Sequence, residues 1–170
     1  MNRHVCITFA GPIGSGKTPI AYYLSWNLRL PILNNDSMRV ETQEDEGELI
    51  TDVYISKKDK RLKDIIDRKI DFIYDASIDR QWSRIVELVK NNNYELYVIS
   101  LDFSLKKLEE IYKYKNYDQL DALNKTYQDH QDFLSRYSNE VNLSLTDADF
   151  DDRLDKSLQA IKKLLSETEQ

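Results

Sequence analysis

A glycine-rich stretch near the start of the chain has the residue types that bind a polyphosphate. Residues 11–18 read GPIGSGKT, and three of the four glycines of the 170-residue chain lie there. Glycines let successive backbone N–H groups turn inward and form an anion-binding nest that side chains would obstruct. A lysine and a hydroxyl residue at the end of such a loop supply a movable charge and a ligand for Mg²⁺. The stretch therefore predicts a site for a nucleoside triphosphate.

Every fixed position of the pattern GxxxxGK(S/T) is present, so each loop residue has an expected role. Lys17 is predicted to reach the β- and γ-phosphates, and Thr18 to place its hydroxyl on the Mg²⁺ that bridges them. The alternative is a tight glycine turn followed by an incidental lysine. On the first interpretation the backbone around the phosphates comes from Gly11, Pro12, Ile13, Gly14, Ser15 and Gly16.

Two aspartates and an arginine follow apolar runs that could bring them to this loop. Asp75 ends the run DFIYD, where it could hold the water shell of Mg²⁺, orient a nucleophile or cap the next helix. Asp36 and Arg39 are three residues apart and would share a face of a first helical turn. Asp36 could accept a proton from an attacking hydroxyl, and Arg39 could bind the acceptor's phosphate. The alternative is a helix cap at Asp36 and a solvent-facing Arg39.

The elements that would position these residues alternate between strands and helices. Apolar, partly β-branched runs predict strands at 5–10, 31–34, 71–75, 96–100 and 141–145. Helical spacing predicts helices at 17–29 and 149–167 and one that carries Trp82, and residues 102–136 are predicted to form two helices outside the sheet. This alternation predicts an α/β fold of three layers, with a five-stranded parallel sheet covered on both faces. Residues 1–170 are predicted to form a single domain.

Charge gives no general reason for nucleic acid or membrane binding. The net charge is -6 and the pI is near 5.0. The basic run 57–63, KKDKRLK, leaves a local nucleic-acid site open, and a solvated helix face is the alternative. The acidic run 41–48 predicts a solvated, mobile loop. No apolar segment approaches a membrane-spanning length, so no membrane partner is predicted.

Cysteine and histidine are too few for a disulfide or a zinc site. Cys6 is the single cysteine and lies in an apolar run, which favours a core position and a reducing compartment. His4 and His130 are the only histidines, so a set of zinc ligands is not expected. A cytoplasmic location is predicted.

The glycine loop, the segment NNDSMR and the segment FIYDASIDRQW together resemble the small P-loop kinases with nucleoside monophosphate kinase architecture. That group includes adenylate, shikimate and gluconate kinases and polynucleotide 5′-hydroxyl kinases. The resemblance implies the P-loop NTPase fold, ATP and Mg²⁺ as cofactors, and a helical lid at about 102–136. In the polynucleotide kinases, residues similar to Asp36 and Arg39 act as general base and acceptor-phosphate ligand. Lys17 and Asp75 are the other residues to which the resemblance gives catalytic roles, and Asp75 joins Thr18 as a candidate Mg²⁺ ligand, directly or through water.

The lid is where the chain departs from this family. Such kinases carry lid arginines that close over the transferred phosphoryl group, whereas SLKKLEEIYKYKNYDQ contains lysines and no arginine. Lysine supplies charge but lacks the planar fork of arginine. Lys113 and Lys115 are the predicted lid cations, with solvated lysines as the alternative. Four arginines elsewhere could take their place: Arg80, Arg84, Arg136 and Arg153.

The predicted function is an ATP-dependent phosphotransferase that acts on a hydroxyl of a small molecule or a nucleoside. Asp36 as a base favours a hydroxyl, because a monophosphate is already ionised at neutral pH. A polynucleotide 5′-hydroxyl kinase and a nucleotide kinase are the alternatives among enzymes. A nucleotide-binding module with weak or no turnover is the alternative of another class, and the lid without arginine is the reason for it.

Overall fold

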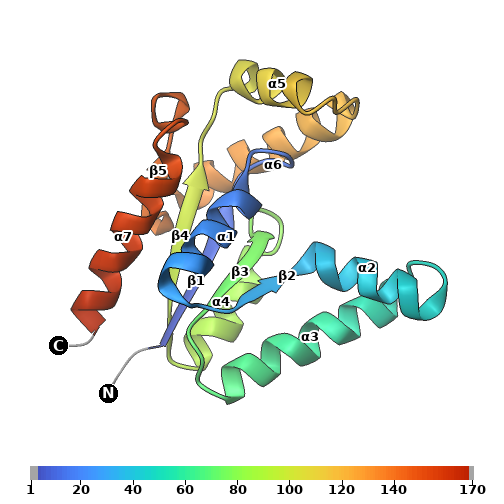
Figure 1. Cartoon of the computed structure of the whole chain (residues 1–170), viewed down its shortest axis with the longest axis vertical. Helices are drawn as coiled ribbons and strands as arrows, with labels where there is room; N and C mark the ends of the chain where they lie inside the picture. The colour runs from blue at the N-terminus through green and yellow to red at the C-terminus, as the bar shows by residue number, and fades with distance from the viewer. Residues whose placement is uncertain (1–3, 169–170) are drawn as a thin grey trace.

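The computed structural model describes residues 4–168, and a sheet of five parallel strands lies at its centre (Figure 1). The strands lie in the order β2-β3-β1-β4-β5, and all four pairings are parallel. This topology confirms the α/β fold with a five-stranded parallel sheet. The strand bounds are β1 His4–Ala10, β2 Ile32–Asn34, β3 Phe72–Ser77, β4 Tyr94–Leu101 and β5 Leu143–Leu145.

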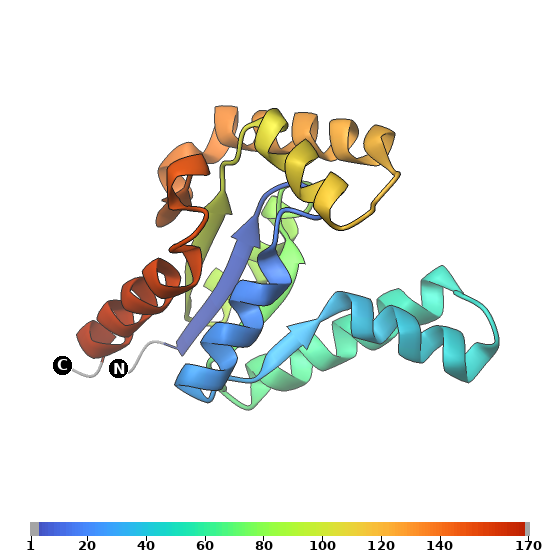
Figure 2. The ribbon, with the colours of Figure 1, turned by 45° about the horizontal axis from the view of Figure 1, so that its top comes forward.

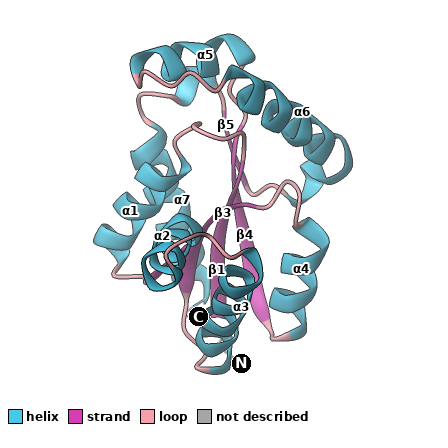
Figure 3. Cartoon of the chain, turned by 90° about the vertical axis from the view of Figure 1, so that its right-hand side faces the viewer, coloured by secondary structure: helices cyan, strands magenta, loops and turns pink. Residues whose placement is uncertain are grey.

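Helices cover both faces of the sheet, as Figure 3 shows with the strands seen from the side. α1 (Lys17–Leu28) and α7 (Arg153–Thr168) lie on one face, and α3 (Thr51–Asp67) and α4 (Trp82–Asn91) lie on the other. The side chains of the central strand β1 pack alternately against these two helix layers, because successive side chains of a strand point to opposite faces. Val5, Ile7 and Phe9 pack with α1 and α7, whereas Cys6 packs with α3 and α4.

α2 (Asn35–Glu46) and α3 form a hairpin that projects away from the sheet (Figure 2). The prediction of a mobile acidic loop at 41–48 is therefore wrong, since most of that run is helical. Arg61 on α3 donates to both carboxylate oxygens of Glu41 at 2.6 and 2.8 Å, and Lys57 pairs with Asp45. The basic run of α3 thus forms ion pairs with the acidic run of α2. These pairs neutralise two cations of the basic run, Lys57 and Arg61.

α5 (Leu105–Tyr114) and α6 (Leu120–Tyr137) lie beyond the carboxyl ends of the strands, which confirms the two helices predicted within 102–136 (Figure 1). Short 3₁₀ turns at Ser138–Glu140 and Asp147–Asp149 flank β5. The second turn explains why α7 begins later than predicted, because Thr146 and Asp149 form a separate capping box there. Within residues 4–168, none of the helices is both long and apolar enough to cross a bilayer.

Candidate active site

The glycine loop leaves the end of β1 and enters the first turn of α1 in a conformation that requires glycine. Gly11, Gly14 and Gly16 have φ values of 140°, 75° and 103°, which L side chains rarely adopt. A Cβ at Gly14 would also lie 2.4 Å from Cε2 of Tyr112. Gly16 is the residue before α1, and no side chain caps that helix. The first amides of α1 therefore remain available to an anion, and the helix dipole favours one there.

Lys17 is folded back onto the loop. Its Nζ donates to the carbonyl oxygens of Gly11 and Pro12 at 2.9 and 2.6 Å, and to the hydroxyl of Ser15 at 3.3 Å. Burial lowers the pKa of Lys17 to about 8, although three nearby carboxylates act in the opposite direction. The ammonium group thus has neutral loop carbonyls as its hydrogen-bond partners. A phosphate oxygen, which carries negative charge, could take their place as its partner. The three carboxylates are those of Asp79, Asp75 and Asp36.

Thr18 and Asp75 meet beside Lys17. The Thr18 hydroxyl donates to Asp75 Oδ1 at 3.3 Å, and Asn34 Nδ2 donates to Asp75 Oδ2 at 2.5 Å. Asp75 is only 6% exposed, and burial raises its pKa. Its carboxylate faces α1 and β2, so it does not cap the following helix. The Asn34 side chain accepts the backbone N–H of Ser37 and thereby caps α2, which excludes a capping role for Asp36.

The predicted acceptor residues lie across a small cavity from the loop. Asp36 and Arg39 are exposed residues in the first two turns of α2, and both line a cavity of about 270 Å³. Lys17, Thr18 and Asp75 line the same cavity. The structure therefore brings together all the residues for which the sequence predicted a catalytic role, although they come from three different segments.

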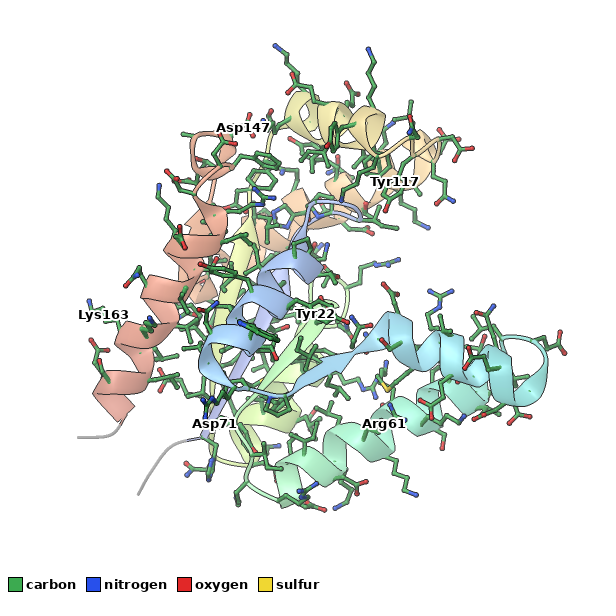
Figure 4. The ribbon with its side chains drawn as sticks, in the orientation of Figure 1. Tyr22, Arg61, Asp71, Tyr117, Asp147 and Lys163 are labelled. Carbon is green, nitrogen blue, oxygen red and sulfur yellow. The ribbon has the colours of Figure 1, made fainter. Side chains whose placement is uncertain are left out.

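A second cavity, of about 630 Å³, lies between the glycine loop and the turn that joins α5 to α6. Ile13, Lys17, Thr18 and Asp36 line both cavities, so the two cavities share a wall that includes Lys17. Figure 4 labels Tyr117, which lies in the α5–α6 turn and lines the second cavity. The remaining wall is formed by the loop, the first turn of α1, the end of α5 and that turn: Gly14, Gly16, Pro19, Tyr112, Lys115, Asn116, Asp118 and Gln119.

The two predicted lid lysines have different positions. Lys115 Nζ donates to the carbonyl oxygen of Gly14 at 3.2 Å and lines the second cavity. Beside it, the Tyr112 hydroxyl donates to the carbonyl oxygen of Ile13 at 3.2 Å. Lys113 is exposed on α5 and lines neither cavity. The structure thus places Lys115, and not Lys113, beside the loop.

Two of the four alternative arginines also lie near the loop. Arg80 lines the first cavity and pairs with Asp129 at 3.5 Å. A Cβ built at Gly16 would lie 3.9 Å from Arg153 Nε, which is buried without a hydrogen-bond partner. Arg84 instead pairs with Asp59 on α3, and Arg136 lies exposed in the last turn of α6.

Sequence reasoning missed a group of polar side chains that hold the loop from outside. The Asp79 carboxylate accepts the backbone N–H of Gly11 at 3.1 and 3.3 Å. The Thr126 hydroxyl on α6 accepts the backbone N–H of Ile13 at 3.2 Å. His130, one turn further along α6, is buried against Asp79. These residues come from segments far apart in the sequence, so no local pattern identifies them.

Comparison with known proteins gives matches among solved structures. No protein-family model matches this chain, and no match is found among curated proteins. A candidate kinase from Chloroflexus aurantiacus superposes with a TM-score of 0.70 at 15% identity and covers 99% of each chain. A gluconokinase from Sinorhizobium meliloti gives 0.64 at 18% identity, with 96% of this chain and 95% of its own covered.

An APS kinase from Mycobacterium tuberculosis gives a TM-score of 0.58 at 16% identity, with 95% of this chain and 99% of its own covered. Shikimate kinases from several bacteria match at a similar level. The shared architecture extends over nearly the whole of each chain. This chain therefore has the fold of the small P-loop kinases.

Proposed function

We propose that this protein is an ATP-dependent phosphotransferase that moves the γ-phosphoryl group of Mg-ATP to a hydroxyl of a small molecule or a nucleoside. The observation that carries the proposal is the position of Lys17 where two cavities meet. The larger cavity holds the nucleotide phosphates on the loop, and the smaller one holds the acceptor. A phosphoryl group that passes between them then moves past Lys17.

The nucleotide side has the groups that Mg-ATP requires. The loop amides and the uncapped start of α1 would hold the phosphate oxygens, with Lys17 as the cation. The Thr18 hydroxyl and the Asp75 carboxylate are oxygen ligands of the kind that Mg²⁺ takes together with water. Held by these two side chains, Mg²⁺ would supply positive charge that offsets the charge of the phosphates. The APS kinase neighbour was solved in complex with AMPPNP and APS, which supports a nucleotide in this fold.

The acceptor side favours a small molecule. The cavity of about 270 Å³ is at the lower limit of the volumes typical of ligand pockets. Asp36 would accept the hydroxyl proton, and Arg39 would bind an anionic group of the acceptor. A shikimate kinase neighbour was solved in complex with shikimate, in agreement with an acceptor of this size. The catalytic contribution of the chain is positioning and charge compensation, since phosphoryl transfer needs little covalent chemistry from the protein.

A long polynucleotide is disfavoured as the acceptor. Strand binding depends on cations that neutralise phosphates, and the chain carries a net charge of -6. The basic run of α3 is also used within the protein, because Lys57 and Arg61 pair with acids of α2 and Lys63 pairs with Asp67. The buried, unbridged Cys6 is compatible with the reducing cytoplasm that we propose as the location.

A nucleotide-binding module without turnover is the second candidate. Its support is the arginine-free turn between α5 and α6, where Lys115 is the cation beside the loop. Calorimetric titration with ATP, with and without Mg²⁺, followed by a transfer assay with a panel of small hydroxyl compounds separates the two candidates. The phosphotransferase binds Mg-ATP and phosphorylates at least one acceptor. Tight binding without transfer to any acceptor favours the module, and no binding at all contradicts both.

A further inference from the structure

A chain of polar side chains, with the buried His130 at its centre, links the glycine loop to the ends of β4 and β5. His130 on α6 is 0% exposed, and its two ring nitrogens face two carboxylates. Nε2 lies 2.9 Å from Asp102 Oδ1, and Nδ1 lies 3.3 Å from Asp79 Oδ2. Asp102 also accepts hydrogen bonds from the hydroxyls of Ser100 and Ser144. At the other end, Asp79 accepts the N–H of Gly11.

The two carboxylates favour a charged ring between them. Nε2 makes a hydrogen bond with Asp102, whereas the 3.3 Å approach of Nδ1 to Asp79 is an ion-pair contact without a hydrogen bond. A neutral imidazole carries a single N–H, whereas an imidazolium carries one on each nitrogen and a positive charge that acts on both acids. Burial alone lowers the pKa of His130, but the interactions with Asp102 and Asp79 more than offset burial and raise it to about 9. Hydrogen bonds from His130 and the two serines likewise hold the pKa of Asp102 below its ordinary value, against the effect of burial.

The charge of Asp79 matters because this residue lies beside the phosphate site. Its side chain is only 5% exposed, lines the smaller cavity and is the carboxylate that acts most strongly on Lys17. A carboxylate without a neighbouring cation would attract Lys17 and repel a triphosphate at short range. The Asp79 carboxylate nevertheless has a structural role, because it accepts the backbone N–H of Gly11 in the loop.

We propose that His130 is a positioning residue for the phosphate site: as a cation between Asp79 and Asp102, it neutralises Asp79. Asp79 can then hold the Gly11 amide without competing with the triphosphate for Lys17. Thr126, one turn earlier on α6, accepts the N–H of Ile13, so α6 supports the loop at two points. This inference rests on the proposed function, because it assumes that the loop binds a triphosphate.

The test uses a variant that removes the charge of His130 and keeps a hydrogen-bonding side chain of similar length. His130→Gln retains an N–H donor for Asp102, but leaves Asp79 without a cation. The expected result is a loss of Mg-ATP affinity of about tenfold or more, since uncompensated like charges at short range are costly. Calorimetric titration measures the affinity, and thermal unfolding of the same samples records stability separately.

A double variant separates charge neutralisation from structural support. In His130→Gln combined with Asp79→Asn, the uncompensated carboxylate is gone, so the Mg-ATP affinity is expected to return to within about threefold of Asp79→Asn alone. If His130 only supported the packing, the losses of the two single variants would add. A double variant whose loss of Mg-ATP affinity equals the summed losses of the two single variants therefore overturns the inference.

A matched control and a spectroscopic measurement complete the test. His4 pairs with Asp71 at the amino end of β1, away from the loop, and His4→Gln is expected to bind Mg-ATP as the wild type does. If neither the wild type nor His4→Gln binds Mg-ATP, the proposed function fails together with this inference. If the wild type binds and His130→Gln binds equally, only this inference fails. Nitrogen NMR of the wild type, with His4→Gln for assignment, is expected to show His130 doubly protonated at neutral pH. A neutral ring contradicts the inference even if His130→Gln does not fold.

Discussion

The Thr18 hydroxyl donates to the carboxylate of Asp75 across 3.3 Å and so joins the first turn of α1 to β3. The two residues are 57 positions apart in the sequence, yet each contributes an oxygen of the kind that Mg²⁺ binds. Asn34 holds the other oxygen of Asp75, which fixes the direction of the carboxylate. Three segments of the chain therefore place two oxygen atoms beside the loop, where we propose that Mg²⁺ binds.

Asp75→Asn is expected to raise the Mg²⁺ concentration required for half-maximal activity. An amide of the same size retains one oxygen but loses the negative charge that attracts the cation. Activity measured against Mg²⁺ concentration at fixed total ATP tests this expectation. Asp71→Asn, at the opposite end of the same sheet, is the control with unchanged Mg²⁺ dependence. An unaltered Mg²⁺ requirement in Asp75→Asn would remove this residue from the metal site.

Lys17→Ala is expected to weaken triphosphate binding and to abolish transfer while the protein still folds. The side chain reaches the loop carbonyls and lies at the junction of the two cavities, so its loss removes the cation nearest the transferred group. Calorimetry gives the affinity, and circular dichroism reports the fold. Lys113→Ala, whose side chain lines neither cavity, is the matched control. Wild-type ATP affinity in Lys17→Ala would count against the loop assignment.

Asp36→Asn is expected to lower turnover by roughly 10²- to 10⁴-fold, the range typical of a lost general base, with little change in ATP affinity. The residue lies in the first turn of α2 and faces the acceptor cavity. Glu44→Gln, which changes an exposed acid on the same helix, is expected to keep full turnover. Equal turnover in Asp36→Asn and Glu44→Gln would leave Asp36 without a catalytic role.

Gly14→Ala is expected to impair Mg-ATP binding more than Gly47→Ala does. Both glycines have positive φ, at 75° and 79°, so both substitutions carry a similar backbone strain of about 1–2 kcal/mol. Only at Gly14 would the added methyl meet the ring of Tyr112, because nothing lies within 4 Å at Gly47. Parallel calorimetry and urea unfolding compare the two variants. Equal losses would show that contact with the α5–α6 segment does not constrain the loop.

The pH dependence of stability is expected to reveal the charged state of His130. Its pKa is raised from 6.5 to about 9 on folding, so the folded state holds the proton more tightly. The corresponding stabilisation is complete below about pH 6.5 and is lost as the pH rises through about 9. Burial of Lys17, whose pKa falls from 10.5 to about 8, has the opposite sign: its destabilising contribution is constant below about pH 8 and is relieved as the pH rises from about 8 to 10.5.

Urea unfolding between about pH 6.5 and pH 8 therefore isolates the contribution of His130. The free energy of unfolding of the wild type is expected to fall over this range relative to that of His130→Gln. Parallel curves for the two proteins would mean that the ring does not change its protonation on unfolding.

The parts of the molecule that the sequence predicted depend on local patterns. Buried strands are continuous apolar runs, and the glycine loop is a contiguous motif, so both are visible in a single segment. Thr18 and Asp75 could be paired from sequence because the carboxyl ends of neighbouring parallel strands meet at one edge of the sheet. The boundaries of α7 and β5 were less accurate, since side-chain caps such as that of Thr146 and Asp149 set them.

The parts that the sequence could not predict depend on contacts between distant segments. The acidic run of α2 is polar enough to suggest a loop, but Arg61 lies 20 residues beyond Glu41 and binds it. His130 has no periodic pattern of polar neighbours that would indicate a buried cation. Its role depends on Asp79 and Asp102, which reach it from the ends of two other strands.

The hairpin of α2 and α3 has a mechanical consequence for the acceptor cavity. Asp36 and Arg39 lie at the base of the hairpin, directly after the three-residue strand β2. The ion pairs of Glu41 with Arg61 and of Asp45 with Lys57 fasten the two helices to each other farther out. A displacement of α2 is therefore expected to carry α3 with it and to change the separation between Lys17 and the pair Asp36 and Arg39.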